Sequence, residues 1–278
     1  MLRILIFAAS ALILGCSSLP GRKARQQAPD LKEVKAGGVS FVYSTRDFAG
    51  VKIEKIEKDT VLGKDGPADG KGESPEHYCF NLMDEKPLPA LVHGSRYFFP
   101  SDTFICAFPL RDASVKDFGK AYFGLNNDAG DLRKLLRDRP ADLERWSETT
   151  KTNIPDFPDL DAGSSIVSKF QYLDFRSGSG VLFLTQYANE QEPNPANNEE
   201  LTLDFQGLTK DGRYYVAARL AITHPSLPKG IDFTDGIKRD MHWNYLKREE
   251  KALDRLPEAS FQPSMKSLKA MLASIQVE

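Results

Sequence analysis

The chain has 278 residues, of which 41% are hydrophobic and 27% are charged. This is the composition of a soluble globular protein, and it excludes a disordered chain and a chain built of membrane-spanning segments. The 37 Lys and Arg residues against 39 Asp and Glu residues leave a formal net charge of −2, so nucleic acid, whose recognition needs an excess of cations, is not an expected partner.

The first residues have the pattern of an export signal. Arg3 precedes an apolar stretch over residues 4–14 that is interrupted only by Ser10. At about 1.5 Å per residue this stretch is too short to cross a hydrocarbon core of about 30 Å. We therefore expect a signal peptide over residues 1–15.

A cysteine follows this stretch directly. Ile13-Leu14-Gly15-Cys16 resembles the lipobox of bacterial lipoproteins, although a residue smaller than Leu14 is commoner at that position. The resemblance implies a lipid anchor, with acyl chains such as palmitate on Cys16, and two or three chains hold a protein at a membrane almost permanently. Ser17 is not the aspartate that retains such proteins at the inner membrane, which favours the outer membrane. The alternative is an ordinary signal peptide.

Residues 17–38 have no apolar periodicity and are rich in Pro, Gly, Gln and charged residues. This composition is typical of a flexible segment. We expect residues 16–38 to be the lipidated cysteine and its tether, and residues 39–278 to be a single α+β domain.

Two further cysteines, Cys79 and Cys106, lie in expected strands over residues 77–82 and 103–108. An even number of cysteines in an exported protein suggests a disulfide. Strand alternation places Cys79 on the outer face, and Cys106 shares that face only if Ile105 and Ala107 point to the core. A disulfide and two free thiols both remain open at this point.

The first half of the domain mixes strands with a helical insert. Alternation predicts strands over residues 39–43 and 51–56, joined by residues 46–50, and the Gly-rich segment 63–72 predicts a loop. Leu132, Leu135 and Leu136 recur at helical spacing. They predict a helical insert over about residues 115–146.

The second half predicts an antiparallel meander of strands over residues 166–175, 181–188, 201–205 and 214–222. Gly178-Ser-Gly180 is expected to close the first hairpin and Lys210-Asp-Gly212 to form a tight turn. Residues 201–205 alternate cleanly, which predicts one solvated face. Residues 181–184 are all apolar, which predicts a strand covered on both faces.

Two helices follow, over about residues 240–256 and from about Ser264. Met265, Leu268, Leu272 and Ile275 form an apolar stripe on the second of them. Such helices need a sheet face to cover. The expected fold is therefore α+β, sandwich-like, with an antiparallel sheet layered with helices.

Several runs resemble a family of uncharacterised bacterial secreted proteins and lipoproteins. They lie over residues 180–188, 197–201, 205–209, 211–216 and 224–228, with shorter ones at 75–77 and 261–264. The resemblance implies no activity. The strand-rich middle and the C-terminal helix are similar in style to the PsbP/Mog1-like sandwich.

No motif in the sequence dictates a reaction. The histidines His77, His93, His224 and His242 have no metal-ligand spacing, the acidic run 156–163 does not match a calcium loop, and no G-x-S-x-G or P-loop occurs. We therefore assign no catalytic residue, cofactor or metal ligand. Tyr97-Phe-Phe-Pro100 is either a lid over a sheet edge or an exposed patch for a partner or apolar ligand.

These observations predict a lipid-anchored protein of the bacterial cell envelope, facing the periplasm or the cell surface. Its expected role is non-catalytic: binding to another envelope protein or structural support. The alternative is a hydrolase or a small-ligand carrier whose polar site is assembled by folding from residues that are far apart in the sequence.

Overall fold

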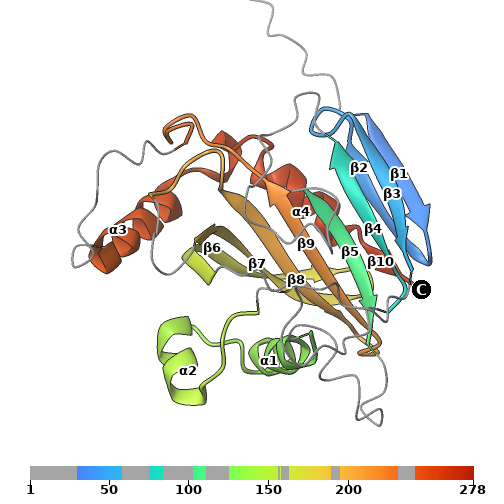
Figure 1. Cartoon of the computed structure of the whole chain (residues 1–278), viewed down its shortest axis with the longest axis horizontal. Coiled ribbons are helices and arrows are strands. Elements are labelled where there is room, and N and C mark those ends of the chain that lie inside the picture. The colour runs from blue at the N-terminus through green and yellow to red at the C-terminus, as the bar shows by residue number, and fades with distance from the viewer. Residues whose placement is uncertain are drawn as a thin grey trace, which may run out of the picture.

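The structure is a computed structural model of the chain (Figure 1). It describes residues 30–57, 75–83, 103–110, 125–155, 157, 163–188, 195–230 and 242–278. Several expectations therefore fall outside the described residues: the signal peptide, Cys16, the loop 63–72, His93 and Tyr97-Phe-Phe-Pro100.

Most strands form one seven-stranded sheet in the order β3-β4-β5-β9-β8-β7-β6, and every neighbouring pair is antiparallel. Their bounds are β3 Gly50–Ile56, β4 His77–Met83, β5 Phe104–Pro109, β6 Gly163–Phe175, β7 Gly178–Ala188, β8 Thr202–Thr209 and β9 Tyr214–Ala221. The last four strands follow one another in space as they do in the sequence. The expected meander is confirmed.

A three-stranded sheet of β1 (Leu31–Ala36), β2 (Val39–Ser44) and β10 (Gln276–Val277) lies beside it. The expected tether over residues 16–38 is therefore wrong at its C-terminal end. Leu31 pairs with Ser44 and Ala36 with Val39, while Gly37 and Gly38 have φ of 56° and 77°. Two consecutive glycines with positive φ suit a two-residue hairpin turn. The folded body therefore includes β1, which lies before the expected start of the domain at residue 39.

The two strands expected over residues 39–43 and 51–56 are present as β2 and β3, but they belong to different sheets. The short connection between them crosses from one sheet to the other. The sheets pack together where the Phe41 and Phe80 rings meet edge to face, with centroids 5.3 Å apart.

Helices cover both faces of the large sheet (Figure 1). Their bounds are α1 Leu125–Asp138, α2 Leu143–Thr150, α3 His242–Arg255 and α4 Met265–Ala273. One core lies between the two sheets, α3 and α4, and the other lies beneath α1 and α2. The α+β class, with a sheet layered with helices, is confirmed.

The helices refine two expectations. The helical insert, expected over about residues 115–146, includes α1 and α2 and continues to Thr150, just before the left-handed C-cap Lys151. Asp142 begins α2 as its N-cap and accepts from the Arg145 amide at 3.0 Å. The C-terminal helix begins after Ser264, which accepts from the Ser267 amide. All four residues of its predicted stripe are fully buried, and Ile275 lies just past its end.

The hairpin between β6 and β7 differs from the prediction. Phe175 pairs with Gly178, so residues 176 and 177 form the turn and Gly178 and Gly180 lie inside β7. A Cβ on Gly180 would lie 2.4 Å from the Gln206 carbonyl oxygen. These glycines permit close strand contact and do not make the turn. The tight turn at residues 210–212 is as expected, with Gly212 at φ 68°.

The predicted solvated face of residues 201–205 is also wrong. Every residue of β8 is buried, including Thr202, Asp204 and Gln206. Residues 181–184 are buried on both faces as predicted. Helices and loops thus cover both faces of the central strands, and the polar residues of β8 find partners inside the molecule.

Candidate functional site

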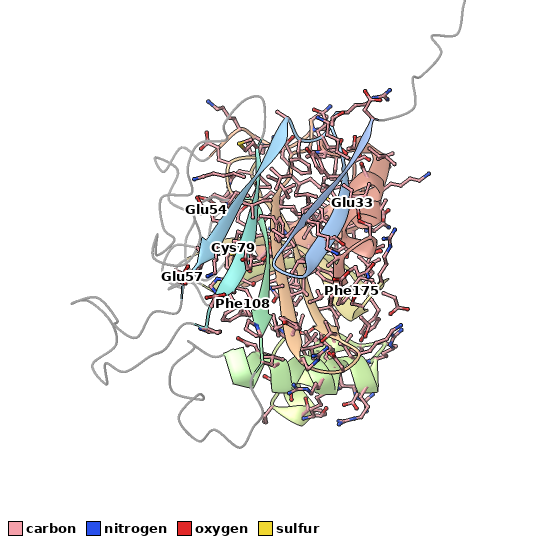
Figure 2. All side chains as sticks on the ribbon, turned by 90° about the vertical axis from the view of Figure 1, so that its right-hand side faces the viewer. Glu33, Glu54, Glu57, Cys79, Phe108 and Phe175 are labelled. Carbon is pink, nitrogen blue, oxygen red and sulfur yellow. A yellow bond between two sulfur atoms is a disulfide. The ribbon has the colours of Figure 1, made fainter. Side chains whose placement is uncertain are left out.

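Cys79 and Cys106 form a disulfide in the structure. They are direct partners of the β4–β5 register, with Cα atoms 4.3 Å apart. Figure 2 shows Cys79 on the strand next to the one that carries Glu54, its register partner. Ile105 and Ala107 point to the opposite core, which is the condition that the sequence set for a disulfide. The face expected to be outer is itself buried, because Phe108, Phe157 and α1 belong to the second core.

A buried ion pair is the main polar feature of the same sheet face. Arg219 on β9 is the register partner of Asp204 on β8, and its Nε donates to Oδ2 at 3.2 Å. Side-chain exposures of 5% and 1% place both charges inside the protein. Asp204 also accepts from the Thr202 hydroxyl at 2.7 Å and from the Tyr187 hydroxyl at 2.6 Å.

Aromatic rings enclose the guanidinium of this pair. Its Cζ lies 4.1 Å from the centroid of Tyr187 and 5.8 Å from that of Phe104. Burial acts to lower the pKa of Arg219, but Tyr187 and Asp204 outweigh it and hold the pKa above its ordinary value. Arg219 therefore stays charged at all relevant pH values.

The Arg219–Asp204 ion pair is poorly suited to catalysis. Asp204 already accepts three hydrogen bonds and faces a permanent cation, so it is unsuited to act as a general base. In the described part of the chain, the Arg219 Nη2 atom is buried and has no hydrogen-bond partner. We interpret the pair as a structural feature that fixes the register of β8 against β9.

A second polar group holds together the loops at one end of the sheet. The Asn197 side chain donates to Gln186 and Glu200, and its Oδ1 accepts from the amides of Glu199 and Glu200. Its neighbour Asn198 bonds to a different segment, as described next. Both asparagines lie in a run that carries the resemblance stated above.

Asn198 clamps the backbone around His224. Its Oδ1 accepts from the His224 amide at 2.7 Å, and its Nδ2 donates to the carbonyls of His224 at 3.1 Å and of Leu227 at 2.9 Å. Thr223 forms an isolated bridge with Gln262. Three of the runs that carry the resemblance, at residues 197–201, 224–228 and 261–264, therefore meet in space.

The imidazole of His224 links two serine hydroxyls. Nδ1 lies 2.7 Å from Ser226 Oγ, and Nε2 lies 2.8 Å from Ser260 Oγ. His224 itself is buried, with 6% exposure, whereas Ser226 is exposed and Ser260 is half-buried. The Phe261 ring packs on the imidazole, with centroids 4.9 Å apart.

The hydrogen bonds around His224 define its tautomer. Ser260 Oγ lies 2.6 Å from the Pro257 carbonyl oxygen, which can only accept, so this hydroxyl proton goes to Pro257. Ser260 must then accept from Nε2–H. Nδ1 is left with a lone pair, which accepts from the Ser226 amide at 3.2 Å and faces the Ser226 hydroxyl. In this tautomer the Nδ1 lone pair of His224 is directed at an exposed serine.

Two other histidines lie within the described residues. His77 is buried at the start of β4 and belongs to the second core, and His242 begins α3. Within the described ranges, no three His, Cys, Asp or Glu side chains gather to hold a metal ion. Nor does any helix in those ranges have the length and apolar character needed to cross a bilayer.

No family model, no curated protein and no solved structure matches the chain.

Sequence reasoning missed the Arg219–Asp204 ion pair and the group around His224. Asp204 and Arg219 are 15 residues apart along the chain, and the meander register that makes them neighbours is not encoded in either strand. His224 and Ser226 are close in sequence, and the spacing His-Pro-Ser was visible. Ser260, which defines the tautomer, comes from a distant segment.

Proposed function

We propose that this chain is a lipid-anchored protein of the bacterial cell envelope, held at a membrane by acyl chains on Cys16. The observation that carries the proposal is the sequence Ile13-Leu14-Gly15-Cys16 directly after an apolar stretch with Arg3 before it. An acyl chain gains about 0.8 kcal/mol for each CH₂ transferred into the membrane, so two or three chains would retain the protein there.

The disulfide supports export. Disulfides persist in oxidising compartments such as the periplasm and the cell surface, and they are rare in the cytosol. Cys79 and Cys106 are bonded and fully buried within the folded body. An exported location is the setting in which such a bond forms during folding.

For the folded body we propose that it binds another envelope protein or supports the cell surface. The charges buried in the sheet neutralise each other, since Arg219 pairs with Asp204. The first strand of the described residues, β1, begins at Leu31. The proposed tether is accordingly shorter than the sequence suggested and runs from Cys16 to about residue 30.

A membrane-fractionation experiment tests the anchor. The parent and a Cys16→Ser variant are expressed with a palmitate analogue that carries an alkyne, and membranes are sedimented and washed with high salt. The parent should take up the analogue and sediment, and mass spectrometry should find its N-terminus at an acylated Cys16. The variant should lose the label and resist signal cleavage at residue 15.

A Ser18→Ala variant is the matched control, because it changes a neighbouring small residue and leaves Cys16 intact. It should behave as the parent does. Separation of inner and outer membranes on a density gradient then tests the outer-membrane assignment. An unmodified Cys16 in the mature parent, or cleavage elsewhere, would overturn the proposal.

A further inference from the structure

The group around His224 has the arrangement of an activated nucleophile. An exposed hydroxyl faces the Nδ1 lone pair of an imidazole, and a third group holds the imidazole in that tautomer. Nucleophilic serines in enzymes show this relation of nucleophile, base and orienting group. Here the three members are Ser226, His224 and Ser260.

We propose that Ser226 is a nucleophile for acyl transfer, with His224 as its general base and Ser260 as a positioning residue. The substrate class is a carboxylic ester presented at the protein surface, because Ser226 lies on an exposed turn. The inference goes beyond the envelope role proposed above and does not depend on the anchor.

Geometry supports the assignment of the base. The 2.7 Å distance between Ser226 Oγ and His224 Nδ1 is within the range over which proton transfer occurs. The imidazole is shielded, with 6% of the residue exposed. Within the described part of the chain, the groups that reach Nδ1 are the hydroxyl and the amide of Ser226.

Rigid contacts preorganise this base. Asn198 bonds both the amide and the carbonyl of His224, and the Leu227 amide donates to the same carbonyl at 3.0 Å. The Phe261 ring restricts rotation of the imidazole. Because the backbone and Nε2 of His224 are both held, the Nδ1 lone pair stays directed at the Ser226 hydroxyl. This fixed orientation is the condition for efficient proton abstraction.

The proposed reaction is hydrolysis. Ser226 Oγ attacks the ester carbonyl carbon while its proton passes to His224 Nδ1, and Ser260 continues to accept from Nε2–H. The bond to the alcohol breaks, and the alcohol leaves with the proton from Nδ1. Water then gives a proton to Nδ1 and attacks the acyl-serine, and Ser226 regains its proton as the acid leaves. One ester and one water give one acid and one alcohol.

A fluorophosphonate probe tests the nucleophile on the purified full-length chain in detergent. Attack by Ser226 would form an Oγ–P bond and release fluoride, with the proton taken by His224. We expect stoichiometric labelling of the parent, mapped to Ser226 by tandem mass spectrometry. Ser226→Ala should lose the label, since the amide that contacts Nδ1 remains while the hydroxyl is gone.

A matched control is Ser177→Ala. Ser177 is also a turn serine, but its hydroxyl bonds to the carbonyl and amide of Val277 and contacts no imidazole. This variant should label as the parent does. Thermal unfolding of each variant shows whether it is folded.

Ser260→Ala tests the positioning role. Loss of the acceptor for Nε2–H should slow labelling by about tenfold or more, because a general base contributes about 10²–10⁴ to rate and depends on its tautomer. The labelling rate separates this role from a purely structural one, which would lower only the melting temperature.

The outcomes decide the proposal. Absence of label on the folded parent, or label that persists in Ser226→Ala, would overturn it. Label on Ser226 that is equally fast in Ser260→Ala would remove the positioning role. A labelled Ser226 would add a hydrolytic activity to the binding or supporting role proposed for the body, whereas the fate of the anchor depends only on Cys16.

Discussion

A neutral histidine is buried at the start of β4. His77 Nδ1 lies 2.8 Å from the Pro75 carbonyl oxygen, so Nδ1 carries the proton and donates it. Nε2 is buried without a hydrogen-bond partner in the described part of the chain, and the Phe108 ring packs on the imidazole with centroids 4.5 Å apart. Burial lowers the pKa of His77 below 6.5, although the bond to Pro75 acts to raise it.

This lowered pKa predicts acid sensitivity. Below about pH 6.5 the unfolded chain binds a proton at His77 while the folded chain does not. The free energy of unfolding therefore decreases as the pH is lowered, until the pKa of His77 in the folded chain is reached. Urea unfolding at about pH 7.5 and about pH 5.5 measures the loss. A His77→Gln variant, which keeps a donor for Pro75, should lose less stability than the parent between these values. Equal losses would contradict the prediction.

At the scale of elements, close strand contact determines where glycine is needed. The Phe205 ring lies over β7, and a Cβ on Gly180 would lie 2.6 Å from its Cε2 atom and 2.4 Å from the Gln206 carbonyl oxygen. Neither neighbour can move freely, because Gln206 belongs to the β7–β8 ladder and Phe205 packs edge to face on Phe175.

We therefore expect Gly180→Ala to reduce the free energy of unfolding by about 1–3 kcal/mol, the usual cost of overpacking. Gly130→Ala is the control, since this glycine lies inside α1 with nothing within 4 Å of the added methyl group. That variant should be neutral or more stable by up to about 1 kcal/mol. Urea unfolding of both variants measures the contrast, and equal effects would show that crowding at Gly180 is not decisive.

Local patterns predicted the elements well where one face is apolar, as in the meander and α4. They failed where polar residues are buried by distant partners. Asp204 alternates with leucine and phenylalanine, which is typical of a solvated face, but Arg219 on the next strand satisfies it inside the protein. The charged residues of β1 are typical of a tether, and β1 is a strand only because the turn at Gly37 and Gly38 pairs it with β2.

The same lesson applies to the edge strand β6. Lys169 has φ of 55°, and its amide and that of Val167 donate to Asp254 and Glu250 of α3. The Lys169 ammonium donates to the carbonyl of Asp254 in the last turn of α3 and to that of Leu256 just past the helix. The helix thus covers an edge that would otherwise be open to pairing. Periodicity predicted both elements but not this contact.

At the scale of the whole molecule, the large sheet is buried on both faces, with one core against the small sheet and one beneath α1 and α2. The disulfide lies in the second core and joins β4 to β5 across a separation of 27 residues. Of the described strands, β3 and β4 are the part of the large sheet farthest from the meander, and they join it only through β5. The disulfide therefore ties this edge of the sheet to its centre.

Removal of the disulfide should loosen that connection. We expect a Cys79→Ala, Cys106→Ala double variant to lose about 2–5 kcal/mol in the free energy of unfolding, because the unfolded chain regains the freedom of the closed loop. Urea unfolding of both proteins measures the difference. The control is the parent with reductant, which should stay folded and unlabelled by an alkylating reagent at both positions, since both sulfurs are fully buried. A double variant as stable as the parent would mean that β5 holds β3 and β4 in place through its ladder and the two cores alone.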